Sequence, residues 1–408
     1  MRLALACLIA ALPAAGFAQS ELSAEIGRTG LAATGARLEA LAAPGDADRF
    51  ALGGVRFLGA VEAALQLRWR AGLTDPVGFL PFLRLPMAEN PAPAAFEPGM
   101  IAGLFRDVSG RMDAARAPLA EVGDGSAFGL EIALGDLWFD INANGARDAG
   151  EDLVAVAGPM LGSDPAGVPP MVRFDAADAA WLSAYTHLLA GVADSVLAYD
   201  PTDATAEILQ SRRALAALGP VDADPFLGRQ DGLHAVDMIA LILRALDQTP
   251  DAGRAAAARA HFLAMIADNR TFWSRVEAET DNAAEWLPND RQQSALGVVL
   301  PQGTGAVWQG VLADAEALLA GQALVPYWRL ANDGAGSLIP AEAQIAAGAG
   351  VNLGRMFTDP APIDIAGWIQ GVDALPYLER GRVVSAANWR AFESLVAGDA
   401  MLFTLFLN

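Results

Sequence analysis

The feature that most constrains the fold is a spacing of apolar residues at steps of three and four along much of the chain. The clearest example follows Pro98, which stands where the first turn of a helix tolerates proline. Its apolar positions are Ile101, Leu104, Phe105, Val108, Met112, Ala115, Leu119 and Val122. This spacing places side chains on one face of an α-helix, and Pro118 should kink or end that helix. The chain is therefore expected to be mainly α.

Similar patterns predict helices over most of the remaining sequence. One begins at Asp46 or Asp48 and runs through Arg70, and another follows Asp175 as its cap. The further predicted helices cover residues 202–218, 232–246, 252–279, 304–319, 363–372 and 386–396. We expect a multi-helix globular protein with an N-terminal region over 19–158 and a C-terminal region over 170–408. Glycine and proline gather between these regions, which form two domains or one continuous domain.

The first 18 residues have the layout of a secretory signal peptide. Arg2 precedes an apolar run over residues 3–12, and small residues lead to an expected cleavage after Ala18. The alternative, a lipid on Cys7, is weaker because only six residues precede that cysteine. Cys7 is the one cysteine, so cleavage would leave no thiol for disulfides, metal ligation or nucleophilic catalysis. The expected location is the periplasm or the extracellular medium.

The composition excludes several classes of chemistry. All 27 basic residues are arginine, which rules out Schiff-base lysines and the lysine of phosphate-binding loops. A net charge of -21 opposes binding to nucleic acid and attracts divalent cations. After the leader, no segment runs for about 18 apolar residues without charges or helix breakers, so no membrane span is expected.

A polar stretch from Asp140 to Glu151 follows an apolar segment over 128–139 that we expect to be extended. Oxygen-bearing side chains stand at positions 1, 3, 5, 9 and 12 of the stretch, and a glycine stands at position 6. This spacing can surround one Ca²⁺ ion with oxygen atoms. The predicted ligands are Asp140, Asn142, Asn144, Asp148, Glu151 and the backbone carbonyl of Ala146. The alternative is a turn rich in Asn, Asp and Gly that holds no ion.

The motif resembles the calcium loop of EF-hand proteins, and more closely the solitary loops of dockerin-like modules and exported bacterial proteins. The likeness covers about a dozen residues and implies a bound Ca²⁺ with Glu151 as a bidentate ligand. Arg147 departs from the pattern at position 8, where an aliphatic residue usually pairs with a partner loop. We therefore expect a solitary structural site with a Kd of about 10⁻⁴ to 10⁻³ M. The whole chain also resembles exported bacterial proteins without an assigned activity, which implies no function.

A second hypothesis is a hydrolase that acts on glycans. Its candidate catalytic residues, between Trp273 and Trp286, are Glu277, Glu279, Asp281 and Glu285. Glycoside hydrolysis needs two carboxylates about 5 to 10 Å apart, and aromatic rings suit sugar faces. However, tryptophans at helical spacing usually pack in the core, and acidic helix faces are usually solvated. The sequence leans towards a protein without catalysis whose partners are Ca²⁺ and an unidentified protein or glycan.

The three histidines are His187, His234 and His261, all on predicted helices. Asp231 and Asp237 stand three residues either side of His234, so this helix edge could help to hold a transition metal. The alternative, a capping aspartate and a polar helix face, is favoured because no second histidine stands at zinc spacing.

Overall fold

The computed structural model describes residues 20–73, 87–157, 169–219, 230–282, 284–297, 299–330 and 348–396, without the side chains of 230–235. The expected signal peptide and most of the expected seam at 158–170 lie outside the described residues. Within them the chain is mainly helical, as the apolar spacing predicts.

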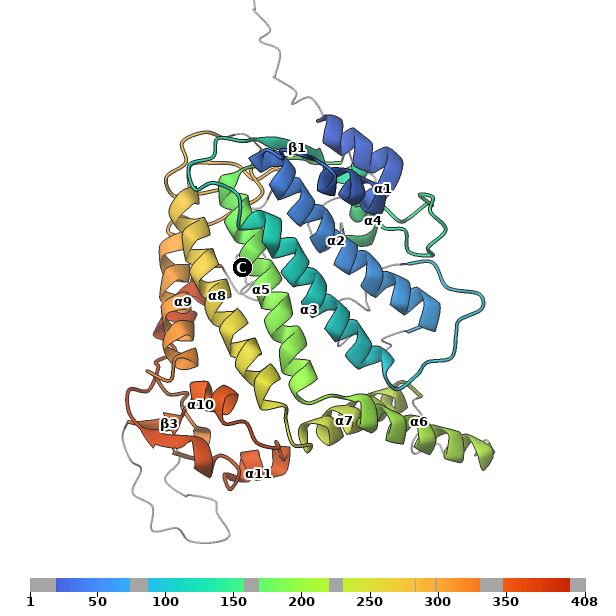
Figure 1. Cartoon of the computed structure of the whole chain (residues 1–408). Coiled ribbons are helices and arrows are strands. Elements are labelled where there is room, and N and C mark those ends of the chain that lie inside the picture. Colours follow the sequence, from blue (N-terminus) through green and yellow to red (C-terminus); the bar gives the residue numbers. More distant parts are fainter. Residues whose placement is uncertain are drawn as a thin grey trace, which may run out of the picture.

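Five long helices form the body of the protein. They are α2 (Asp46–Ala71), α3 (Met100–Leu119), α5 (Ala176–Ala198), α8 (Ala252–Val276) and α9 (Thr304–Leu319). Each packs against the next in this order, and α1 (Glu21–Glu39) packs against α2, as Figure 1 shows. Most residues of α5 are buried because α3 and α8 lie against it.

Shorter elements surround this body. The remaining helices are α4 (Leu153–Ala157), α6 (Thr202–Ala217), α7 (Gln230–Leu246), α10 (Leu353–Thr358), α11 (Ile365–Gln370) and α12 (Ala387–Leu395). The strands are β1 (Leu130–Ala133), β2 (Met171–Phe174), β3 (Ala349–Val351) and β4 (Leu378–Arg380), paired antiparallel as β1 with β2 and β3 with β4. The sequence patterns missed α10, β2, β3 and β4, because elements of three to six residues are too short to show a period.

The ends of α3 and α5 follow from local sequence. The predicted helix α3 begins at Met100, just after Pro98, and Pro118 lies in its last turn. The predicted cap of α5 is confirmed, since the Asp175 side chain accepts a hydrogen bond from the Ala177 N–H. Asp178 bonds back to the Asp175 N–H at 2.9 Å, which completes a capping box.

Among the described residues, α2 is the one helix that is long and apolar enough to cross a membrane. A third of the residues in that apolar stretch are buried inside the protein, and α2 packs against α1 and α3. The core helix of a soluble protein passes the same test, so this finding decides nothing about location.

Candidate functional site

The polar stretch at 140–151 forms a loop whose two ends are tied together. The Phe139 N–H donates to the Glu151 carbonyl at 2.9 Å, and the Leu153 N–H donates to the Leu137 carbonyl at 2.8 Å. Trp138 forms an antiparallel bridge with Asp152 between these two bonds. The segment predicted to be extended is so at Leu130–Ala133 and again at Trp138, but a 3-10 helix at Leu134–Asp136 interrupts it. The loop closes on paired backbone.

Side-chain oxygens curl the first half of the loop through hydrogen bonds from backbone N–H groups. The Asp140 carboxylate accepts from Asn144 N and from Gly145 N, both at 2.9 Å. Asn142 Oδ1 accepts from Asn144 N at 3.0 Å, and Asn144 Oδ1 accepts from Ala146 N at 2.8 Å. Gly145 takes a φ of 77°, a backbone conformation that favours glycine. Loop positions 1, 3 and 5 therefore carry their oxygens on the inner side of the turn.

The second half of the loop meets the first at Asp148. The amide nitrogens of Asn142 and Asn144 donate to the same Oδ2 atom of Asp148, at 2.7 and 2.8 Å. The oxygens of the same amides accept from the backbone N–H groups of Asn144 and Ala146, so an ion at Asp148 would meet amide oxygen only after rotation of these amides. Side chains at loop positions 3, 5 and 9 thus converge on one point.

Glu151 closes the loop with a buried carboxylate, 5% exposed. Its Oε1 accepts from Ile141 N at 3.0 Å, and its Oε2 accepts from Asp148 N at 2.8 Å. Both of these partners are backbone N–H groups, which carry no full positive charge. A buried carboxylate without an opposite charge is costly, so this position favours a nearby cation.

Helix α2 adds a carboxylate that the loop motif does not contain. Glu62 Oε2 accepts from Asp140 N at 2.8 Å, across 78 residues of sequence. Burial raises the pKa of Glu62, and the charges of Asp140 and Glu151 raise it further. The neighbouring Gln66 donates to the Asp140 carbonyl at 2.8 Å. No local pattern marks Glu62 as a site residue, because only the docking of α2 brings it to the loop.

The one basic side chain of the loop points away from these oxygens. Arg147 Nη2 donates to the Gly135 carbonyl at 2.8 Å and lies 3.8 Å from Asp152 Oδ2. A cavity of about 330 Å³ opens beside the loop and is lined by Asn142, Asp148 and Glu151. A hydrated cation therefore has room to reach the carboxylates.

A second group of carboxylates, the Asp175 cluster, consists of Asp175, Glu279 and Glu285. One carboxylate oxygen from each residue lies within 4.8 Å of the others. Burial raises the pKa of Glu279 to about 7, and the charge of Asp175 adds to this effect. Burial also raises the pKa of Asp175, whose carboxylate lies 4.0 Å from Arg173. The cluster could hold a divalent cation or a proton.

The structure brings together only part of the predicted hydrolase site. Glu279 and Glu285 belong to the Asp175 cluster, whereas Glu277 and Asp281 are exposed and lie outside it. Trp273 and Trp308 are 2% and 3% exposed, so neither offers an open face to a sugar. The sequence marked Asp175 only as a helix cap, because its neighbours in the cluster are distant in the chain.

The histidines are arranged differently from the predicted metal edge. His187 and His261 face each other from α5 and α8 with their Nδ1 atoms 2.9 Å apart. Burial lowers the pKa of His187 to about 3 and also lowers the pKa of His261, so both rings are neutral at neutral pH. The side chains of Asp231 and His234 lie outside the described residues, and Asp237 pairs with Arg212 at 3.4 Å.

A scan against protein-family models, a search of curated proteins and a search of solved structures each found no match to this chain. Its function has to be inferred from the chemistry of its own side chains.

Proposed function

We propose that the protein binds one Ca²⁺ ion in loop 140–151 and that this ion has a structural role. The observation that carries the proposal is the meeting of Asn142, Asn144 and Asp148 at one point. It occurs inside a loop that is tied at its ends and closed by the buried Glu151. Five oxygen-bearing side chains and the Ala146 carbonyl supply six donors, which is within the range that Ca²⁺ takes.

The balance of charge supports a divalent cation. Asp140, Asp148 and Glu151 belong to the loop, and Glu62 adjoins it through Asp140. Arg147, the basic residue of the loop, is turned towards Gly135 and Asp152. The donors are carboxylate, amide and carbonyl oxygens without histidine or thiolate, a set that suits Ca²⁺ better than zinc or copper.

A structural role follows from the attachments of the loop. Its two ends pair with each other, and Trp138 beside them donates from its indole nitrogen to the Ile26 carbonyl of α1 at 3.0 Å. Gln66 and Glu62 attach the same point to α2. An ion here would brace a junction between α1, α2 and β1. Weak affinity suits a protein exported to calcium-rich surroundings, a location that we propose from the signal-peptide pattern.

Calcium binding is tested by thermal unfolding of chelator-treated protein with and without 10 mM CaCl₂. At a Kd of about 10⁻⁴ to 10⁻³ M, this concentration stabilises the fold by about 1.4 to 2.7 kcal/mol. The expected result is a Tm that rises by a few degrees with calcium and less with the same concentration of magnesium. An unchanged Tm at saturating calcium would overturn the proposal.

The variant Glu151→Gln keeps the shape of the closing ligand and removes its charge. We expect it to lose most of the calcium-dependent rise in Tm, because an amide cannot bind Ca²⁺ in a bidentate manner. The exposed Glu97 provides the matched control, and Glu97→Gln should respond to calcium like the parent protein. A parent-like response of Glu151→Gln would show that Glu151 is not a ligand.

Glycan hydrolysis is the second candidate, and what favours it is the position of Glu279 beside Glu285. A pKa of about 7 for Glu279 suits a general acid at neutral pH. If this candidate holds, the protein releases reducing sugar from a polysaccharide, Glu279→Gln abolishes the release, and exposed Glu277→Gln retains it. Absence of release from a broad panel of polysaccharides counts against it.

A further inference from the structure

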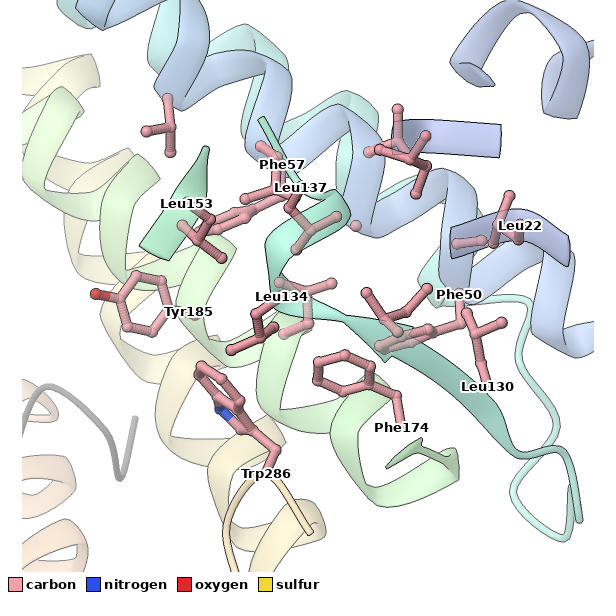
Figure 2. A pocket seen from close by; sticks show the side chains of 18 of the residues that line it. Leu22, Phe50, Phe57, Leu130, Leu134, Leu137, Leu153, Phe174, Tyr185 and Trp286 are labelled. Atoms are coloured by element: carbon pink, nitrogen blue, oxygen red, sulfur yellow. The ribbon is translucent and has the colours of Figure 1, made fainter. Parts of the chain in front are cut away.

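A large apolar cavity lies between α1, α2, β1 and α5, and its lining adjoins both groups of carboxylates at Phe139, Phe174 and Trp286. Its volume is about 330 Å³, and nearly all of its walls are carbon. Figure 2 shows Leu22 and Leu130 at one end, Tyr185 and Trp286 at the other, and Leu134 between them. The cavity is therefore elongated, and Tyr185 and Trp286 lie at the same end (Figure 2).

The volume is too large for an ordinary packing defect. Protein interiors hold few voids larger than a water molecule. Engineered apolar cavities of about 150 Å³ stay dry and bind benzene, and sites for small molecules begin at about 300 Å³. A cavity of this size with carbon walls offers water almost no hydrogen bonds, so an apolar molecule is the occupant that it favours.

Trp286 and Tyr185 close one end of the cavity with their rings (Figure 2). The Trp286 Nε1 atom is covered by protein and has no hydrogen-bond partner among the described residues, so it does not open into the cavity. Burial raises the pKa of the Tyr185 hydroxyl, which therefore keeps its proton. Nearly all of the surface that this end offers to a ligand is carbon.

The charges around the cavity exclude an ionic ligand. None of the described residues that line it is basic or acidic. Asp175 and Glu285 each adjoin a lining residue, Phe174 and Trp286. A carboxylate or phosphate group inside would lack a cation and would face these acids, and an ammonium group would lack an ion partner on the walls.

We propose that this cavity binds an uncharged molecule with a medium-length hydrocarbon chain. The chain runs from the end formed by Trp286 and Tyr185 to the end formed by Leu22 and Leu130 (Figure 2). The carbon walls and the lack of charged residues among the described lining select such a ligand over an ionic one.

Gly54 allows the cavity to be filled without damage to the fold. It lines the cavity from α2, and a Cβ atom at this position meets no atom within 4 Å. Gly54→Leu places a side chain in the cavity and replaces a helix-weakening glycine, so the variant should keep or raise the Tm of the parent. Gly59 on the same helix is equally open but does not line the cavity, which makes Gly59→Leu the matched control.

Binding is measured with the neutral fluorophore N-phenyl-1-naphthylamine on the full exported chain, displaced by methyl decanoate, decanoate or decane. We expect displacement by the ester and by decane, with binding of decanoate at least tenfold weaker at pH 8. Gly54→Leu should weaken fluorophore and ester binding at least tenfold, and Gly59→Leu should bind like the parent. No fluorophore binding, or equal binding by Gly54→Leu, overturns the proposal.

The comparison of decane with decanoate tests the uncharged ligand class. Both carry a chain of similar length, and the walls offer no cation to the carboxylate. Decanoate binding as tight as that of decane contradicts the assigned ligand class.

Discussion

Loop 140–151 and the Asp175 cluster both collect carboxylates, but they do so in different ways. In the loop, neighbouring residues point their oxygens inward because backbone N–H groups of the same loop hold them. In the cluster, Asp175, Glu279 and Glu285 come from separate segments, and burial drives the pKa of Glu279 up to about 7. In the loop, the backbone therefore holds the oxygens in position for a cation. In the Asp175 cluster the carboxylates repel one another, and a bound proton or cation reduces this repulsion.

The largest expected effect tests whether Asp140 organises the loop or whether the loop is a loose turn. Asp140→Ala removes the acceptor for two backbone N–H groups and should destabilise the protein by about 2 to 3 kcal/mol in urea unfolding, even with a chelator present. Asp140→Asn retains one acceptor oxygen, so with a chelator present it should destabilise the protein less than Asp140→Ala does. It should also lose the calcium-dependent rise in Tm. If Asp140→Ala is as stable as the parent, the loop does not depend on these bonds.

A smaller effect tests the backbone of the loop. Gly145 has a φ of 77° and open space around its missing Cβ, so Gly145→Ala adds conformational strain without a clash. The expected loss is about 1 to 2 kcal/mol in urea unfolding. Gly125 also has open space around its missing Cβ, but its φ is not positive. Gly125→Ala should therefore change stability by less than about 0.5 kcal/mol. Equal losses of stability in Gly145→Ala and Gly125→Ala would contradict a positive φ at Gly145.

The smallest expected effect is a stabilisation, and it concerns the Asp175 cluster. The pKa of Glu279 is raised from 4.5 to about 7, so the folded protein holds this proton after the unfolded chain has lost it. Stability from this group therefore falls as the pH rises from 4.5 through about 7. Glu279→Gln should stabilise the protein by about 1 kcal/mol at pH 8, a value reduced for solvent screening, and hardly at all at pH 4.

Urea unfolding at both pH values measures this difference. Glu277→Gln is the control, because Glu277 is exposed and outside the cluster, and it should be neutral at either pH. Destabilisation by Glu279→Gln at pH 8, or the same gain at both pH values, would remove the proposed distinction between the two carboxylate groups.

The sequence by itself determined the parts of this protein that depend on neighbours along the chain. Apolar spacing predicts α3, Asp175 predicts the start of α5, and the stretch from Asp140 to Glu151 predicts a loop with inward oxygens. Each depends on backbone geometry within a few turns, and a period or a capping residue records that geometry directly.

Only the tertiary structure decided which distant groups meet. The contact between Glu62 and Asp140 spans 78 residues, and Glu279 and Glu285 reach Asp175 through the packing of α8 against α5. Apolar residues such as Leu134 and Trp286 look alike in sequence whether they fill a core or surround a cavity. That outcome depends on how side-chain volumes fit between packed elements, which no local spacing records.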